Sequence, residues 1–591
     1  MKKLLKSGGS LVILAGFAAA LTAQPAAAQD AAAIQSIQQQ IQQLQSQLKK
    51  LQVDAARRDI ELKKAQDDAA QARAAAAASA ASAAAVQATP LPAALSVPST
   101  VLPGSAIATI PPNDKDASGA PVFNAKKPNG SFNIGGITVT LGGYIDLTAL
   151  ERTRNENAGV ATSFASGIPF PNSPNYRTGE LRATAQQSRF SVLLTGNPYD
   201  GAQLSAYAET DLQSAGSSSN SQQTNSYTLR VRQAYVQFDD SNDNLHFLGG
   251  QAWSLLTPFK SGLTPRAENV PPVLENSIVQ GFAYARQPQL RVSTSVGNVA
   301  FFGVSLEAPQ TTFGGTKPTI ANESLQATSV TYTGATPAVN TGTVASGGLN
   351  PITTYSYNTL PDLIAKVAIE PGFGHYELYG IARSFKDEKI TGTTVATFDG
   401  SSGDATTAGG GIGASAFVSL VPGLIDVSGN VLAGYGIGRY GSAGLPDATY
   451  KANGAPQPLP EIEAMLGVIG HVTPALDLFA YGGTEQEGRK FGGTGASGYG
   501  YGNPTATNFS NADCGVINNA AAPGACTANT KAATGIQVGA WYTALRGGFG
   551  TLKAGVSYQY DKREVFDNKL GGAPTTDENV FLVTVRYSPF Q

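Results

Sequence analysis

The feature that most constrains this chain is a repeated alternation of apolar and polar residues in short segments from residue 132 to the C-terminus. Near the end of the chain, for example, every second residue from Leu552 to Tyr560 is apolar. Such a segment has one apolar and one polar face, and about ten residues suffice for a tilted strand to cross a bilayer. We count about sixteen such segments. They begin near residues 138, 187, 202, 227, 244, 286, 299, 361, 375, 409, 424, 460, 475, 533, 551 and 576.

The connections between these segments alternate in length, and the longest lies between Pro309 and Pro361. Short periplasmic turns and long outer loops are typical of outer-membrane barrels, and an even strand count brings both ends of the barrel to the periplasmic side. The sequence therefore predicts an all-β transmembrane barrel of about 16 antiparallel strands, preceded by an N-terminal α-helical coiled coil. The short connections are 197–201, 239–243, 297–298, 371–374, 421–423, 471–474 and 546–550.

Residues 1–28 have the features of a cleaved signal peptide. Lysines precede a short apolar stretch at 11–21, and the alanines at 26–28 supply a small-residue cleavage site before Gln29. We therefore expect the mature chain to lie in the cell envelope, where disulfides can form. Cys514 and Cys526 lie in a segment without strand pattern, so we predict that they form a disulfide that closes one loop.

Residues 29–68 carry a heptad seam whose spacings alternate between three and four. The seam places the apolar side chains on one stripe of a helix, and Ile at both core positions favours three strands. We predict a periplasmic coiled coil that joins three copies of the chain; a lone solvated helix is the alternative. Residues 69–131, rich in Ala and Pro, are predicted to be a linker, and 132–591 the barrel. The seam consists of Ile34, Ile37, Ile41, Leu44, Leu48, Leu51 and Ala55.

The composition argues against several classes of function. The formal net charge of -2 provides no basic excess for nucleic acid. After the first 30 residues, the chain lacks an apolar run of the length that a membrane helix needs. The three histidines, His246, His375 and His471, have no recognisable catalytic spacing, and two cysteines do not make a zinc site. We therefore expect no enzyme activity, no metal and no cofactor.

The polar face of the predicted strands carries several positive charges. If the apolar residues face lipid, these cations face the lumen, where a row of fixed positive charge raises the local anion concentration. We therefore predict that they line the pore or bind solute. In the alternative interpretation they pair with Asp146, Glu209, Asp211 and acidic residues of the loops in a network that stiffens the wall. The predicted set is Arg189, Arg230, Arg232, Arg291, Lys366, Lys553 and Arg586.

The third long loop, residues 255–285, follows the fifth predicted strand. In sixteen-stranded barrels this loop usually folds inward as the constriction. Lys260, Arg266, Glu268 and Glu275 would then set pore size and selectivity. Exposure of the loop on the outer surface is the other placement.

Six motifs recur in order along the barrel region. They are Gly142-Gly143-Tyr144-Ile145, Gln187-Ser188-Arg189-Phe190, Arg230-Val231-Arg232-Gln233-Ala234-Tyr235-Val236, Gly249-Gly250-Gln251-Ala252-Trp253-Ser254, Arg286-Gln287-Pro288-Gln289-Leu290-Arg291 and Gly436-Ile437-Gly438-Arg439-Tyr440. With these motifs the chain resembles the DcaP-like trimeric porins of Gram-negative outer membranes. The resemblance implies a trimer of sixteen-stranded barrels with uptake biased toward small anions, including dicarboxylates. The long linker and the C-terminal Gln591 depart from the family pattern.

These observations lead to one expected function and two alternatives. We expect an outer-membrane porin for passive diffusion of small hydrophilic, preferentially anionic solutes, with outer-membrane lipid and two further copies of the chain as partners. In the first alternative, residues 29–131 tether the outer membrane to the cell wall. In the second, the pore selects saccharides, for which an aromatic lining would be needed; Tyr144 and Tyr207 are the residues that clearly face inward.

Overall fold

A computed structural model describes residues 130–156, 158–214, 228–275, 279–318, 356–389, 403–517 and 526–590. All of them belong to the second of the two compact units into which the chain divides, Gly104–Gln591. The predicted signal peptide, coiled coil and most of the linker lie outside the described residues. The barrel prediction from residue 132 onward can therefore be compared with the structure.

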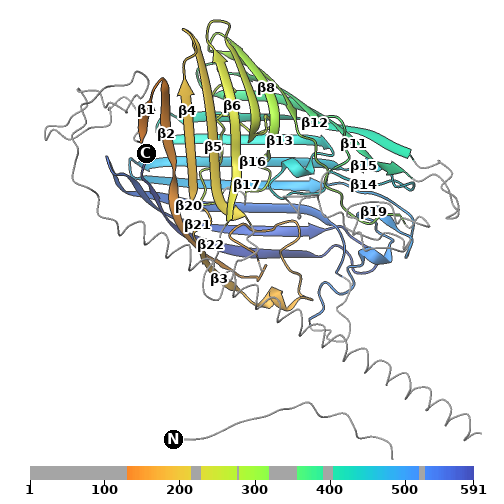
Figure 1. Ribbon diagram of the computed structural model, residues 1–591. Coiled ribbons are helices and arrows are strands. Elements are labelled where there is room, and N and C mark those ends of the chain that lie inside the picture. The colour runs from red at the N-terminus through yellow and green to blue at the C-terminus, as the bar shows by residue number, and fades with distance from the viewer. Residues whose placement is uncertain are drawn as a thin grey trace, which may run out of the picture. The chain divides into compact units, whose positions relative to one another are not determined.

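The described strands form one eighteen-stranded antiparallel sheet that closes on itself. Apart from β1 and β3, two short strands at the seam, sixteen strands make the wall, each paired with its neighbours in chain order. In Figure 1 the near strands β4–β6 cross the far strands β13–β22 at a large angle, as tilted barrel strands do. The wall consists of β2 (Ile137–Arg152), β4 (Arg189–Gly196), β5 (Ala202–Ser214), β6 (Thr228–Asp240), β7 (Leu245–Trp253), β8 (Arg286–Val296), β9 (Ala300–Glu307), β10 (Asp362–Ile369), β11 (His375–Lys389), β12 (Gly403–Val421), β13 (Ile425–Tyr435), β16 (Pro460–Thr473), β17 (Leu476–Glu487), β20 (Thr530–Gly547), β21 (Gly550–Val565) and β22 (Thr575–Ser588).

The barrel closes on β2, whose two halves have different partners. Its first half pairs with β4 on one side, from Ile137↔Gly196 to Tyr144↔Arg189. Its second half pairs with β22 on the other side. The short strands β1 (Ser131–Ile134) and β3 (Glu180–Thr184) pair with parts of the remaining edges of β2, at Ile137–Thr140 and Thr148–Arg152. A closed sheet is the form in which strands can cross a bilayer.

The strand pattern predicted from the sequence is confirmed. Each of the sixteen predicted segments corresponds to one wall strand, and the seven short connections lie where they were expected. The largest difference is at β12, which begins at Gly403 rather than near residue 409 because it continues beside β11 toward the long loop. There the alternation is masked by small residues, and the Gly-Ala-Thr sequence gives little signal of a strand.

The outward face of the barrel is apolar. Ile145 and Leu147 are 51% and 59% exposed, while Asp146 and Thr148 between them are fully buried. The same alternation ends the chain, where Phe581, Val583, Val585 and Tyr587 point outward, and the inward residues between them are Leu582, Thr584 and Arg586. Large exposed apolar side chains on every second residue are unfavourable in water and suit a lipid environment. Among the described residues, no helix is long and apolar enough to span a membrane.

The long loops contain small elements of their own. Two hairpins, β14–β15 (Ala448–Tyr450 and Pro456–Pro458) and β18–β19 (Lys490–Gly492 and Tyr499–Tyr501), lie in the connections after β13 and β17. Short 3₁₀ turns are η1 (Pro174–Arg177), η3 (Gly438–Tyr440) and η4 (Thr507–Phe509). The predicted disulfide between Cys514 and Cys526 is confirmed. It packs in a small cluster with Phe170, Ala528 and Val565, and so joins two long loops to the end of β21.

The exposed apolar belt gives a test of membrane depth. Leu466, 61% exposed, lies in the middle of β16, whereas Leu424, 45% exposed, lies in the short turn before β13. Replacing Leu466 by Arg should lower the free energy of unfolding in lipid vesicles by about 2–4 kcal/mol, and Leu424→Arg should lower it by about 0–1 kcal/mol. Denaturant unfolding in vesicles measures both. Equal costs for the two variants would contradict the assignment of this face to lipid.

The disulfide gives a second test. Serine at both Cys514 and Cys526 removes a cross-link between residues 12 apart. By the chain-entropy model, such a cross-link stabilises the folded loop by about 3 kcal/mol. We expect faster protease cleavage in residues 488–529 and intact barrel strands, as followed by mass spectrometry of the fragments. Cleavage at the wild-type rate would show that packing on Phe170 and Val565 alone holds this loop.

Candidate functional site

The long loop after β7 lies inside the barrel. We call its described residues, 254–275 and 279–285, the inner loop. Trp541 Nε1 of β20 donates to the Pro272 carbonyl at 2.8 Å, and Asn430 Nδ2 of β13 donates to the Gly281 carbonyl at 2.7 Å. Both side chains come from strands far from β7 and β8 in the wall, so the loop crosses the lumen. Of the two placements compatible with the sequence, the structure has the inward one.

The inner loop carries an apolar tip that packs on inward-facing apolar side chains of the wall. Val273, Leu274 and Phe282 share a buried cluster with Phe479 and Leu582, from β17 and β22. This packing explains why the lumen face of several strands is not polar throughout. Burial of apolar surface on both partners stabilises the loop in the lumen.

A cavity of about 390 Å³ lies between the tip of the inner loop and the wall. The loop contributes Lys260 and residues 270–275, and the wall contributes groups of both charge signs and the rings of Tyr144, Phe479 and Trp541. The wall residues that argue for a function are Tyr144, Gln187, Arg189, Asp211, Asp426, His471, Asp477, Trp541, Lys553 and Arg586. The cavity therefore brings together parts of β2, β4, β5, β13, β16, β17, β20, β21 and β22.

Arg586 is held in the wall of the cavity by stacking and by one carboxylate. Its guanidinium lies 4.1 Å from the centroid of the Tyr144 ring and 4.8 Å from that of Trp541. Its Nε donates to Asp146 Oδ2 at 2.8 Å, and its Nη2 to the Leu274 carbonyl of the inner loop at 3.3 Å. The contacts orient a cation whose planar face is covered and whose edge remains able to bind an anion.

Lys553 and Lys260 complete the positive part of the lining. Neither forms an ion pair with another residue of the described part of the chain. Arg189, by contrast, has Glu209 at 3.9 Å, a long contact. An ammonium group without a carboxylate partner keeps its charge available to a passing solute.

The negative lining is more fully paired. His471 connects Asp477, with Nδ1 to Oδ1 at 2.7 Å, and Asp426, with Nε2 to Oδ2 at 3.2 Å. On the inner loop, Glu275 Oε2 accepts from Gln187 at 2.6 Å and from Gln213 at 2.9 Å. These hydrogen bonds occupy carboxylate oxygens that would otherwise attract cations.

The structure separates the seven predicted pore cations into three that line the cavity, one that is partly exposed outside it and three that are buried. Arg189, Lys553 and Arg586 line the cavity, while the side chain of Arg230 is 35% exposed and binds Asp211 at 2.7 Å. The other three, Arg232, Arg291 and Lys366, are at most 2% exposed.

The three buried cations do not face the cavity, because the inner loop covers them or carboxylates enclose them. Arg232 binds Glu209 at 2.7 Å and Asp211 at 2.9 Å. Lys366 donates to the Thr257 carbonyl of the inner loop, and Arg291 to that of Trp253 at its start. Arg232 therefore has the carboxylate partners of the alternative interpretation, whereas Lys366 binds Glu377 of β11 and Arg291 binds neutral groups.

The four predicted residues of the inner loop have different positions. Lys260 and Glu275 line the cavity. Arg266 is exposed and its guanidinium lies 5.7 Å from the Tyr207 ring, on the side of β5. Glu268 pairs through its backbone with Phe259 and does not line the cavity. Two of the four predicted residues of the inner loop therefore line the cavity.

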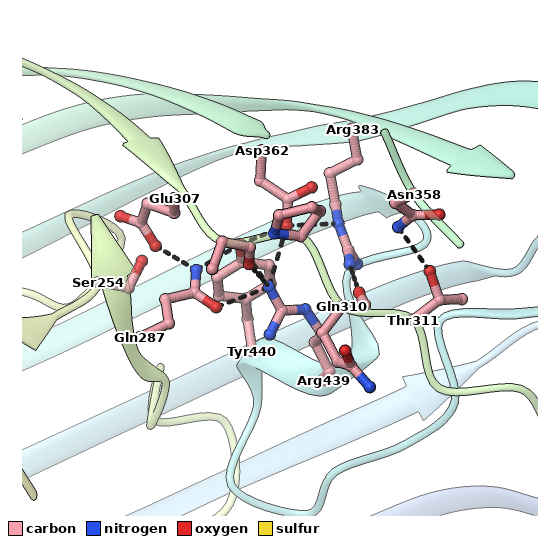
Figure 2. A network of polar contacts seen from close by, with 12 residues as sticks. Ser254, Gln287, Glu307, Gln310, Thr311, Asn358, Asp362, Arg383, Arg439 and Tyr440 are labelled. Carbon is pink, nitrogen blue, oxygen red and sulfur yellow. Dashed lines mark hydrogen bonds and ion pairs between the residues drawn. The ribbon is translucent and has the colours of Figure 1, made fainter. Parts of the chain in front are cut away.

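A further polar network, absent from the sequence prediction, ties the loop that contains η3 to the ends of several wall strands (Figure 2). Asp362 of β10 accepts from Arg439, Tyr440 and Arg383, at 3.0, 2.8 and 3.1 Å. Gln287 of β8 connects the same group to Glu307 of β9. The loop that contains η3 is thus fixed to four wall strands. Within the described residues, no cluster of His, Cys, Asp and Glu has the arrangement of a metal site.

Several cavity residues were missed because the sequence gave no reason to connect them. Asp426, His471 and Asp477 lie at the ends of short turns, where charge is ordinary. Gln187 lies in the break between β3 and β4, and this irregularity turns its side chain toward Thr148 and Glu275. The Val270–Leu274 stretch was the one available signal, since an apolar run with two prolines is unusual in an exposed loop.

Comparison with known proteins identifies the fold of this chain. No protein-family model matches the sequence. No curated protein matches it either. The structure is similar to the outer-membrane channel DcaP of Acinetobacter baumannii, with a TM-score of 0.50 and 14% identity over 79% of this chain and 99% of that one. Weaker similarity is found to an anion-selective porin from Comamonas acidovorans, with TM-score 0.38 and 11% identity over 76% and 99% of the two chains. The resemblance to the DcaP-like porins is therefore confirmed at the level of the fold.

Proposed function

We propose that this protein is an outer-membrane porin through which small hydrophilic solutes diffuse, with a preference for anions and in particular for small dicarboxylates. The closed barrel and its apolar outer belt support the location, and the inner loop and cavity support a constricted pathway. The proposal includes the periplasmic coiled coil and a homotrimer joined through it and the barrel wall. These two points rest on the heptad seam and on the family resemblance.

The proposed preference for anions rests on which charged groups around the cavity have partners and which have none. Four cations and four carboxylates line it. Asp211 is neutralised by Arg230 and Arg232, and Glu275 accepts from two amides. Lys553 and Lys260 keep unpaired charges, so the field that a solute meets is positive.

The pair Arg586 and Lys553 suits a carboxylate solute. They are cross-strand partners on β22 and β21, in register at Lys553↔Arg586. Side chains of such a pair lie about 5 Å apart at Cβ. A solute with two carboxylates can therefore bind the guanidinium edge and the ammonium at once, or move between them without crossing an uncharged gap.

Single-channel recording tests the proposed function. Purified full-length protein in a planar bilayer should conduct in three equal steps, and the reversal potential under a salt gradient should show anion preference. Cation preference would contradict the argument from the cavity lining. Absence of conductance would overturn the porin assignment itself.

Lys553→Glu tests the charge that carries the argument. The substitution replaces an unpaired cation of the lining by an anion, so the reversal potential should shift toward cation preference. Lys531→Glu is the matched control, because this lysine lies on β20 outside the cavity with its side chain 50% exposed. A shift of the same size in both variants would show that overall charge, not the cavity, sets selectivity.

A further inference from the structure

Four wall carboxylates accept backbone N–H groups of the inner loop. The pairs are Leu255 N to Glu307 Oε1 at 2.8 Å, Phe259 N to Glu377 Oε1 at 3.1 Å, Gly262 N to Glu370 Oε1 at 2.6 Å and Gly281 N to Glu485 Oε1 at 2.8 Å. Hydrogen bonds to an ionised acceptor are roughly twice as strong as neutral ones. Three of these contacts fall within nine residues, 255–263, which we call the arm of the inner loop.

Two of the three arm carboxylates belong to one buried ionic group. We call Lys366, Glu370, His375 and Glu377 the anchor cluster. His375 bridges the two carboxylates, with Nδ1 to Glu370 Oε1 at 2.9 Å and Nε2 to Glu377 Oε1 at 3.1 Å. Lys366 Nζ binds Glu377 Oε2 at 2.9 Å. The side chains of Lys366, His375 and Glu377 are at most 2% exposed, so water does not replace these contacts.

The anchor cluster binds both a carbonyl group and an N–H group of the arm. Lys366 Nζ donates to the Thr257 carbonyl at 2.9 Å, while its partner Glu377 accepts the Phe259 N–H. The Lys366 ammonium also lies 5.0 Å from the centroid of the Phe259 ring. One buried ion pair therefore fixes a donor, an acceptor and a side chain within three successive residues.

The arm leads directly into the cavity. Lys260, which follows Phe259, lines the cavity, and its N–H donates to the carbonyl of Ala267, further along the inner loop. On the wall side, Leu255 and Leu263 lie against Gly303, where an added Cβ would be 3.2–3.4 Å from their methyl groups. A displacement of the arm away from the wall would move Lys260 and narrow or widen the space beside it.

We propose that the anchor cluster is the positioning device of the constriction: it fixes the arm of the inner loop and thereby sets the conductance of the pore. Lys366 and Glu377 act through the loop and do not themselves meet the solute. This inference rests on the proposed porin function. The cations that the sequence suggested as pore lining thus divide into those that meet the solute and those, such as Lys366, that hold the residue which does.

The test is a charge-neutral double variant, Lys366→Met with Glu377→Gln. It removes both charges together, since removal of one would leave the other buried without a partner. We expect a folded barrel by circular dichroism, single-channel current that fluctuates between levels with a raised mean conductance, and unchanged sign of ion selectivity. Amide hydrogen exchange at Leu255, Phe259 and Gly262 should be faster than in the wild type.

Arg152→Met with Glu180→Gln is the matched control. This pair, at 2.9 Å, is also buried, with side chains 0% and 6% exposed; it joins β2 to β3, and the other hydrogen bonds of Arg152 go to the carbonyls of Gly159 and Val160, outside the inner loop. Its variant should lose stability and keep the wild-type single-channel level. A second variant, Glu370→Gln, acts at the edge of the cluster, where the side chain is 26% exposed, and should speed exchange at Gly262 even where the double variant fails to fold.

The outcomes separate the two proposals. If the wild type conducts and the folded double variant conducts at the same steady level, the anchor is overturned and the porin stands. If the wild type does not conduct, the porin assignment falls, and exchange at the three arm amides still decides whether the cluster holds the loop. Wild-type exchange rates in both the double variant and Glu370→Gln would overturn the anchor in either case.

Discussion

Every backbone N–H and C=O within a bilayer must find a partner inside the protein, and the rest of this structure depends on that constraint. The wall meets it by closing on β2, whose two halves pair with β4 and β22 while β1 and β3 pair with parts of its remaining edges. Because the closed wall satisfies its own backbone, its inward side chains are free for other partners. They use this freedom to hold a loop whose backbone would otherwise be unpaired in the lumen.

Many inward-facing side chains of the wall bind or pack against the inner loop. Glutamates on β9, β11 and β17 and in the turn before β11 accept its amides, an amide side chain on β13 donates to one of its carbonyls, and apolar side chains on β17 and β22 pack on its tip. The wall cations then fall into two classes. Those under the loop, such as Lys366, bind its carbonyls or buried carboxylates, and those beyond its tip, such as Lys553, line the cavity.

The sequence predicted the wall well because its signal is local. Alternation with a period of two specifies which side chains of β22 face lipid, and turn residues specify where each strand ends. The disulfide was predictable from compartment and position. Alternation does not indicate how far along the lumen a side chain lies, or whether another part of the chain covers it. Arg291 and Lys553 look alike in sequence, yet one is covered by the inner loop and the other lines the cavity. Likewise, Asp426 and Asp477 meet at His471 only through the register of β13, β16 and β17.

The inner loop lies in the middle of the chain, but its partners come from the end. Leu274 meets Arg586, 312 residues later, and Pro272 meets Trp541, 269 residues later. Gly281 and Gly483 let the loop backbone pass so close to the wall that an added Cβ at either would lie within 2.1 Å of a carbonyl oxygen. Because the partners of the loop include β20 and β22, which come last in the chain, we infer that the loop docks before or while β22 pairs with β2. Docking of the loop and closure of the barrel are then one cooperative step of folding.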